Sequence, residues 1–584
     1  MIAGEHTIRF GATVSQMLKT ENASSGAAFF EFNTWQDFLL GNDYYYTQQS
    51  RDTIPDLHYT NYEMYIQDDW QVSPKLTFNL GLRYSYFPSP ADVLDTLVNF
   101  DPKFFIPTNA PQIDPTTGNF ATESPATYEN GLIYPTGTDC SLAQQVNSAQ
   151  ATCSPWGAHV DPDPKDNFGP RFGFAYNPSG DNKTAIHGGF GIFYDRMLNG
   201  IWEQNGFQES PGLQVDTVYH SSFDDPSGAN TPPVYPNRIT ATGTPVMKNP
   251  SYWDYNITLQ RQIAPSLVAS IGYVGTTGRH LLGEREINQP TLAAREANPT
   301  AWATAVMPYL GYAAFEDRIP GYNSNYSSLQ VSLNARDFHG LTLGVAYTWS
   351  KTMTNLSNDR GQESYDTYNL NLDYGASELN QPQTVNITYV YDLPFMASQH
   401  GVLGHLAGGW ELSGISEFYS GMSQTVTQYL DNFNSGDCSV AATYFTPNEP
   451  NNPPCPTTGL YPDGLNMDAS DIALRPDQIA SIKRAKTQLN WFSASSFADA
   501  WGHFGNTSNG SFIGPGLDLW DIALMKNIQV KSWAQFQFRA ELFNAFNHNS
   551  FNGVGTVTDA YYNFGQAISS HDPREIQLGG KLYF

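Results

Sequence analysis

Apolar and polar residues alternate strictly along several stretches of this chain. In EIQLGGKLYF at 575–584, the isoleucine, both leucines and the phenylalanine share one phase, and the glutamine and lysine share the other. The same period of two recurs in KLTFNLGLRYSYF at 75–87, LQVSLNAR at 329–336 and AQFQFRAEL at 534–542. Successive side chains of a β-strand point to opposite faces, whereas a helix repeats every 3.6 residues. We therefore expect many strands, each with one apolar and one polar face.

Fourteen segments of the chain show this strand pattern. They lie at about 5–15, 59–72, 75–87, 167–177, 184–194, 252–263, 266–275, 325–337, 341–351, 382–392, 409–427, 519–529, 533–546 and 575–584. Short connections such as VSPK, NPSGDNK, IAPS, DFHG and QVKS alternate with long ones at about 16–58, 88–166, 195–251, 276–324, 352–381, 428–518 and 547–574. This alternation predicts that all long connections lie at the same end of the sheet.

Long strands and connections sorted by length are typical of a transmembrane β-barrel. A soluble β-sandwich also alternates, but its strands have about five or six residues and its loops are not sorted. The mean hydropathy of −0.41 fits apolar residues spread in alternation, and no apolar run is long enough for a transmembrane helix. We therefore expect an all-β fold, a transmembrane antiparallel up-and-down β-barrel with long extracellular loops. Its apolar faces would contact the lipid bilayer and lipopolysaccharide.

Several charged residues share the polar phase of these strands: Arg83, Arg336, Arg539, Glu541 and Lys581. A cation on the lipid face at mid-membrane costs about 2–4 kcal/mol. We therefore expect these five side chains to face an aqueous lumen, where they would contact a plug or a transported ligand. Salt bridges within the lumen are the alternative role.

The four cysteines form two local pairs by spacing, Cys140 with Cys153 and Cys438 with Cys455. Each pair lies in a long connection rich in Pro, Asn, Thr and Gly, and no Cys-x-x-Cys spacing indicates zinc. We predict two loop disulfides formed in an oxidising compartment. Four free thiols are the alternative.

The charge balance and the motifs argue against several classes of function. With 29 Lys+Arg against 56 Asp+Glu, the formal net charge of −27 does not favour a nucleic-acid partner, because phosphate contacts require a basic footprint. GYVGTTGRH at 272–280 lacks the Gly-Lys-Ser/Thr ending of a phosphate-binding loop, and Ser416 lies outside a Gly-x-Ser-x-Gly motif. We therefore expect no catalytic residue, no cofactor and no metal site.

Six blocks cover nearly every predicted strand in order. They are YIQDDWQVSPKLTFNLGLRY, NFGPRFGFAYNPSGDNKTAIHGGFGIFYDR, LQRQIAPSLVASIGYVGTTGRHL, YSSLQVSLNARDFHGLTLGVAYTWSK, GWELSGISEFYSG, and FRAELFNAFNHNSF followed by DPREIQLGGKLYF. As a set they resemble the Oar-like TonB-dependent receptors of Gram-negative bacteria. The ending also resembles the assembly signal of outer-membrane barrels, with a polar residue, a glycine and two apolar residues at Gln577, Gly579, Leu582 and Phe584.

The resemblance implies an N-terminal regulatory domain, a TonB box, a plug and a barrel of 22 strands in the complete receptor. Residues 1–584 match only the barrel, with about fourteen strands. We therefore expect this chain to be the C-terminal portion of such a barrel, with no plug, TonB box or signal peptide. Its partners would be the barrel-assembly machinery, and TonB only through the missing N-terminal part.

The resemblance also implies a function. The chain would be the barrel of a non-enzymatic outer-membrane receptor or transporter, energised by TonB in the complete protein. Its extracellular ligand would be large, such as a siderophore, an oligosaccharide or a peptide. Two alternatives remain from other classes: a plugless passive pore and a soluble secreted β-sandwich adhesin.

Overall fold

The computed structural model describes residues 2–20, 29–49, 54–94, 97–121, 129–135, 152–197, 215–219, 237–242, 247–356, 365–396, 399–430, 461, 474–531, 533–559 and 563–584. Helices are short there: α1 (Trp35–Leu40), α4 (Leu292–Ala297) and α5 (Gly401–Ala407). The 3-10 helices described are η1 (Pro102–Phe104), η2 (Pro107–Asn109), η3 (Ala303–Ala305), η4 (Leu370–Asp373) and η5 (Ala494–Ser496). Within these ranges, no helix combines the length and the apolarity needed to cross a membrane.

Fourteen long strands form one antiparallel sheet, which we call the wall. They are β2 (His6–Thr20), β5 (Asp56–Ser73), β6 (Leu76–Tyr86), β11 (Phe168–Tyr176), β12 (Thr184–Tyr194), β15 (Ser251–Ala264), β16 (Leu267–Glu286), β17 (Tyr312–Phe338), β18 (Leu341–Thr354), β20 (Gln383–Asp392), β21 (Trp410–Tyr419), β26 (Leu517–Lys531), β27 (Ala534–Phe543) and β30 (Glu575–Tyr583). Each pairs antiparallel with the next in this order. The fourteen predicted strands and their up-and-down order are confirmed.

Short strands accompany the wall. Four join the same sheet: β1 (Ile2–Ala3), β7 (Ala91–Asp92), β14 (Asn237–Thr242) and β19 (Gly375–Ala376). The others form small separate sheets: β3 (Phe29–Glu31), β4 (Tyr45–Gln49) and β13 (Val215–Tyr219); β8 (Asn99–Phe100), β9 (Leu132–Tyr134) and β10 (Thr152–Cys153); β22 (Ser423–Gln424) and β25 (Phe512–Ile513); β23 (Asp477–Gln478) and β24 (Phe497–Ala498); β28 (Phe551–Val554) and β29 (Ala567–Ser570).

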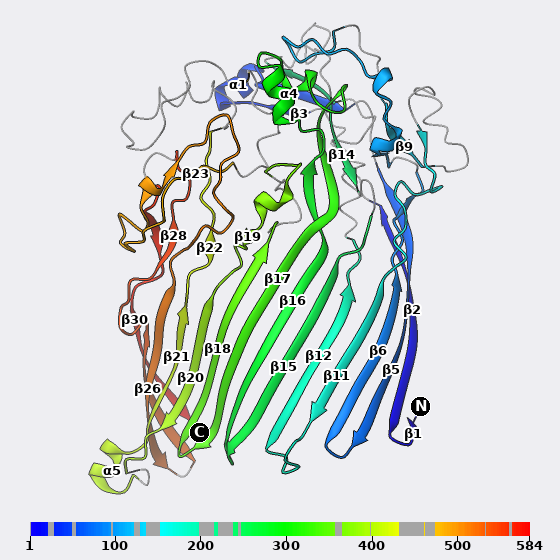
Figure 1. The fold of residues 1–584 in the computed structure, drawn as a ribbon. Coiled ribbons are helices and arrows are strands. Elements are labelled where there is room, and N and C mark those ends of the chain that lie inside the picture. The colour runs from blue at the N-terminus through cyan, green and yellow to red at the C-terminus, as the bar shows by residue number, and fades with distance from the viewer. Residues whose placement is uncertain are drawn as a thin grey trace.

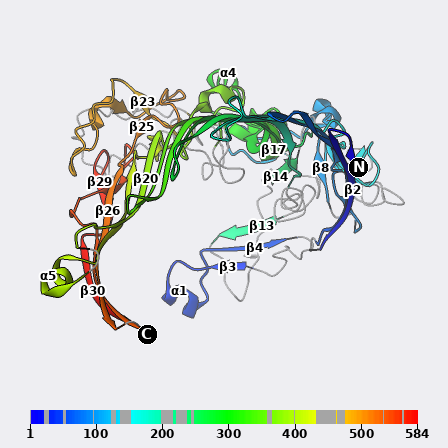
Figure 2. The same ribbon diagram turned by 90° about the horizontal axis from the view of Figure 1, so that it is seen from below.

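The wall strands lie side by side and tilted (Figure 1), and the sheet curves into an arc when seen from below (Figure 2). Strand β2 lies at one end of the arc and β30 at the other. In the part of the chain that the structure describes, no pairing joins these two strands. Because consecutive long strands stay in one curved sheet, the β-sandwich alternative is wrong.

The connections are sorted as predicted. Short turns lie at the end of the wall where both termini are found, and the long connections lie at the opposite end (Figure 1). The turn between β17 and β18 shows why a connection at this end can be so short. Its residues His339 and Gly340 have φ values of 55° and 83°. Two consecutive residues with positive φ match the right-handed twist of the strands that they join.

The wall has two chemically different faces. Phe10, Ile66 and Leu82 form one row across β2, β5 and β6 and are 76%, 55% and 45% exposed. Trp349 lies on the corresponding face of β18, and this side chain shares a cavity with Ile513 of β25. Since β25 lies outside the curve of the sheet (Figure 2), the apolar face is the convex one. The polar face is therefore concave, as expected of a lumen.

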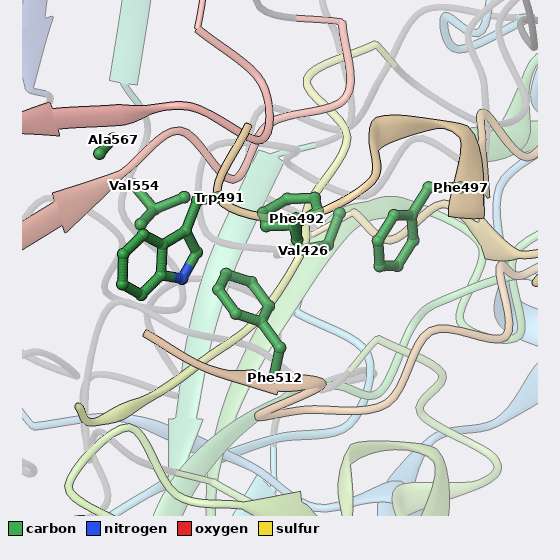
Figure 3. Packing of buried hydrophobic residues seen from close by; sticks show 7 residues of the cluster. All are labelled: Val426, Trp491, Phe492, Phe497, Phe512, Val554 and Ala567. Atoms are coloured by element: carbon green, nitrogen blue, oxygen red, sulfur yellow. The ribbon is translucent and has the colours of Figure 1, made fainter. Parts of the chain in front are cut away.

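The hydrophobic core lies in the long connections rather than in the wall. We call the described residues of these connections, with the adjoining upper parts of β16 and β17, the loop layer. One of its clusters comprises Val426, Trp491, Phe492, Phe497, Phe512, Val554 and Ala567 (Figure 3). Another comprises Val98, Phe100, Leu132, Tyr134, Tyr312 and Phe315. These clusters hold chain segments that are far apart in sequence.

Three strands differ most from the sequence expectation. Strands β16 and β17 have 20 and 27 residues and continue well beyond the predicted segments 266–275 and 325–337, because their upper parts pack into the loop layer. Strand β21 ends at Tyr419, so the predicted segment 409–427 is too long. The connection between β20 and β21 contains α5, which the alternating pattern did not predict.

Candidate functional site

The concave face carries a network of polar side chains on its N-terminal strands. Asp69 of β5 accepts hydrogen bonds from Gln67 Nε2 at 3.0 Å and Asn79 Nδ2 at 2.7 Å. Its other carboxylate oxygen lies 2.9 Å from a guanidinium nitrogen of Arg9. These residues share a face because Arg9 lies opposite Gln67 and Asn79 lies opposite Asp69 in the register. Strand pairing therefore assembles the network from three strands.

Arg83 of β6 forms a second part of this network. Its Nε donates to Glu63 Oε2 at 2.8 Å, and a terminal guanidinium nitrogen donates to the same oxygen. The hydroxyl of Ser85 donates to that oxygen at 3.2 Å. The side chain of Arg83 is 37% exposed and that of Glu63 is 22% exposed, so the pair borders open space. Arg83 thus forms a salt bridge with Glu63 on the concave face, and its predicted position in an aqueous lumen stays a prediction.

A hollow of about 430 Å³ lies beside this network. Its floor contains Gly81, Gly173, Gly189 and Gly191, and Arg171, Asp254 and Asn256 also line it. The guanidinium carbon of Arg171 lies 4.5 Å from the ring centroid of Phe193. A Cβ on Gly191 would lie 2.8 Å from Cε2 of Phe193, so glycine makes room for this ring. The hollow can accept polar groups of either charge on one side and a flat apolar group on the other.

The C-terminal strands carry a separate polar cluster. A guanidinium nitrogen of Arg539 lies 3.0 Å from a carboxylate oxygen of Glu541, two residues along β27. Gln537 on the same face donates to Asn527 Oδ1 at 2.9 Å, and Lys581 of β30 lies opposite Gln537 in the register. Lys581 is exposed. This cluster lines the concave face at the other end of the arc.

The five predicted lumenal residues do not meet at one point. Along the wall, nine strands separate Arg83 on β6 from Arg539 on β27: β11, β12, β15, β16, β17, β18, β20, β21 and β26. Arg336 lies two residues before the end of β17, beside the short turn, and is exposed. Contact of any of these side chains with a plug or a ligand stays a prediction.

The predicted assembly residues lie on both faces of β30. Gln577 and Gly579 lie opposite Glu541 and Arg539 on the concave face. Leu582 and Phe584 share the phase of Leu578 on the convex side and are 58% and 93% exposed. Their recognition by an assembly machine stays a prediction.

Cys153 is disulfide-bonded. Its predicted partner Cys140 and the second predicted pair, Cys438 with Cys455, lie outside the described residues. The two pairings therefore stay predictions.

Sequence reasoning missed Glu63, Asp69, Arg171 and Phe193. The first two lie in NYEMYIQDDWQ, where the alternation is broken because Asp68 falls in the apolar phase. Asp68 is paired there with His6 Nδ1 at 2.7 Å. Reading every second residue backward from Gln67 would have identified Glu63, whereas the approach of Arg171 to Phe193 depends on tertiary geometry.

Buried charges in the loop layer have a structural role. Arg318 of β17 is 1% exposed, contacts Glu284 and lies 3.6 Å from Glu316. A terminal nitrogen of Arg475 lies 2.9 Å from Asp373. In the described ranges, no group of three or more His, Cys, Asp or Glu residues is arranged to hold a metal ion.

Comparison with known proteins gives a family match. The family model described as outer membrane beta barrel domain matches residues 1–577. No curated protein matches the chain. Among solved structures, the chain is similar to the outer membrane transporter YddB from Escherichia coli, at 10% identity and a TM-score of 0.48, over 100% of this chain and 52% of that one.

Two further solved structures are similar. For the FrpB iron transporter from Neisseria meningitidis, the identity is 11% and the TM-score 0.40, over 100% of this chain and 53% of that one. For the ferripyoverdine receptor of the outer membrane of Pseudomonas aeruginosa, they are 9% and 0.37, over 91% of this chain and 40% of that one. The chain spans about half the length of these proteins or less.

The family match covers nearly the whole wall and agrees with its antiparallel order, its apolar convex face and its polar concave face. The outer-membrane location that the resemblance to Oar-like receptors implied is confirmed. The chain belongs to the outer membrane beta barrel domain family, and its wall lies in the outer membrane of a Gram-negative bacterium.

Proposed function

We propose that this chain is the barrel of a TonB-dependent receptor that takes up a large ligand through its extracellular loops and polar lumen. One observation carries the proposal. A curved wall bears polar side chains along its concave face, and its long connections gather into a packed layer at one end (Figure 1). The six sequence blocks that resemble Oar-like receptors support the same function.

The mixed charge of the concave face favours a ligand with several polar groups. Arg9, Arg83 and Arg171 lie near Glu63 and Asp69 on adjacent strands. Such a surface offers donors and acceptors at short intervals, as an oligosaccharide, a peptide or a siderophore requires. The partners of this function would be an extracellular ligand and, through the complete receptor, TonB.

Uptake measurements in the native host test this function. Cells that carry the gene as encoded are given radiolabelled ferric siderophores, oligosaccharides and peptides, with and without a functional TonB. We expect one class to accumulate only when both the gene and TonB are present. An Arg171→Glu variant should lower this uptake, whereas Lys183→Glu in the exposed turn between β11 and β12 should not. Uptake that continues without TonB would contradict the proposal.

The passive pore is the second candidate, because the described part of the lumen contains an open hollow of about 430 Å³. Planar-bilayer recording on the purified chain separates the two functions. A steady large conductance, with an ion selectivity that changes in the Arg171→Glu variant, would favour the pore. Silence in the bilayer, together with TonB-dependent uptake in cells, favours the receptor.

A further inference from the structure

A cavity of about 790 Å³ lies on the convex, lipid-facing side of the wall, where a loop overhangs the strands. Its floor consists of side chains of β16, β17 and β18, including Tyr273, Leu329 and Trp349. Its roof comes from the connection between β21 and β26, including Ile482 and Phe512. The labels β23 and β25 place this connection outside the curve of the sheet (Figure 2).

The roof is held in place by its own core. Phe512 lines the cavity and also belongs to the aromatic cluster of the loop layer (Figure 3). Its ring centroid lies 4.6 Å from that of Phe492, which is 1% exposed. Ile482 packs against the same cluster. The cavity is thus enclosed between the wall and a roof that packs against its own hydrophobic cluster.

The charge of the cavity is opposite to that of the chain. Among the residues that the structure describes, Lys351 and Arg484 line it, whereas no aspartate or glutamate does. The roof segment 478–498 carries Lys483, Arg484 and Lys486 and contains no acidic residue, although the whole chain has a net charge of −27. Arg484 donates to the carbonyl oxygen of Ile513 at 3.2 Å, which keeps its guanidinium beside the cavity. This concentration of cations favours an anionic group.

The position along the strand defines the surroundings of the cavity. Trp349 lies eight residues from Leu341, the first residue of β18 at the short-turn end. With about 3.3 Å per residue and a tilt of about 45°, this is about 19 Å along the membrane normal. The apolar band of an outer-membrane barrel is about 25 Å tall. Trp349 therefore lies in the upper part of the band, and Lys351 lies near the headgroups of the outer leaflet.

We propose that this cavity binds the lipid A part of lipopolysaccharide, the phosphorylated glycolipid of the outer leaflet. Lys351 and Arg484 contact a phosphate, and the serine hydroxyls that line the cavity contact the sugar. An acyl chain lies against Leu329 and Trp349. The site is separate from the concave lumen and does not depend on which ligand the lumen carries.

Native mass spectrometry on the full chain in detergent tests this site. The probes are bisphosphorylated lipid A, its dephosphorylated form, phosphatidylglycerol and inorganic phosphate. We expect bisphosphorylated lipid A to bind most tightly. The double variant Lys351→Glu with Arg484→Glu should weaken it at least about tenfold, because it replaces both cations that attract the phosphate with carboxylates that repel it. The matched control Lys183→Glu removes an exposed cation at the opposite end of the wall and should leave binding unchanged.

Four results would overturn the proposal: equal binding by the wild type and the double variant, equal binding of the dephosphorylated form, equal binding of phosphatidylglycerol, or binding of inorganic phosphate alone. Should the double variant fail to fold, the neutral pair Lys351→Gln with Arg484→Gln gives the same comparison with a smaller charge change. A Trp349→Ala variant should weaken lipid A but leave the preference for its phosphorylated form intact. Loss of that preference would contradict the separate roles of the ring and the cations.

Discussion

Leu80 in the wall and Phe492 in the loop layer are both large apolar residues, but Leu80 is 40% exposed and Phe492 only 1%. The wall leaves its apolar side chains for lipid to cover, so hydrogen bonds between strands and the surrounding bilayer stabilise it. The cluster around Phe492 in the loop layer is instead covered by other side chains of the long connections. Apolar side chains are therefore covered by lipid in the wall and by protein in the loop layer. Equivalent substitutions should have different effects in the two regions.

The largest expected difference concerns ion pairs. Arg318→Met leaves Glu284 and Glu316 buried without their cation and should lower the free energy of unfolding of the loop layer by about 3–5 kcal/mol. Arg539→Met removes a partly exposed pair in the wall and should cost about 1 kcal/mol or less. Urea unfolding followed by tryptophan fluorescence measures both. Equal losses would show that the two regions are not differently solvated.

The second prediction concerns the two faces of the wall. Leu80→Arg places a cation on the convex face and should lower the folding free energy in lipid vesicles by about 2–4 kcal/mol. Asn79→Arg, one residue away on the concave face, retains a donor for Asp69 and should change stability little. Folding titrations in vesicles provide the measurement. The reverse order of these two losses would mean that the concave face contacts lipid.

The third and smallest prediction concerns pH in the loop layer. Burial raises the pKa of Asp499 to about 6, and the nearby Asp559 carboxylate adds to this rise. The folded state therefore holds this proton more tightly than the unfolded chain does. The contribution of Asp499 to the stability of the loop layer should be greatest below about pH 4 and should fall by about 2–3 kcal/mol as the pH rises to about 6.

An Asp499→Asn variant tests this origin of the pH dependence. The variant should reduce the decrease of the unfolding free energy with pH, because about one proton fewer is released on unfolding. Denaturant unfolding between pH 4 and pH 7 measures this decrease. The hydroxyl of Thr558, which donates to Asp499 at 2.5 Å, can still donate to the amide oxygen. An unchanged pH profile would assign the dependence to other groups, such as Asp373, whose pKa burial also raises to about 6.

The wall could be predicted closely because its pattern is local. All fourteen strands appear in the sequence as an alternation that needs no knowledge of distant residues. The candidate site was only partly predictable. Arg83 and Arg539 were placed on the polar phase, but the sequence did not indicate Glu63 or Asp69 as partners, or the stacking of Arg171 on Phe193. These contacts depend on the register between strands.

The loop layer could not be predicted, because its contacts join segments far apart in the chain. Phe492 and Phe512 meet Val554 only after two connections, between β21 and β26 and between β27 and β30, have folded together. Nothing in the roof segment 478–498 indicates that it overhangs Trp349 on the convex side. Trp491, which lies in the same connection as Phe492, is buried in this cluster as well.

The sequence by itself determined the period of two, the number of wall strands, their order and the end at which the long connections lie. The physical reason is that each strand must present one face to lipid and one to water. This requirement makes neighbouring residues alternate between apolar and polar, and the alternation can be read from the local sequence. Only the tertiary structure decided which polar residues meet on the concave face and how the loops enclose a cavity. These features follow from strand register and from burial among distant segments, which no local pattern encodes.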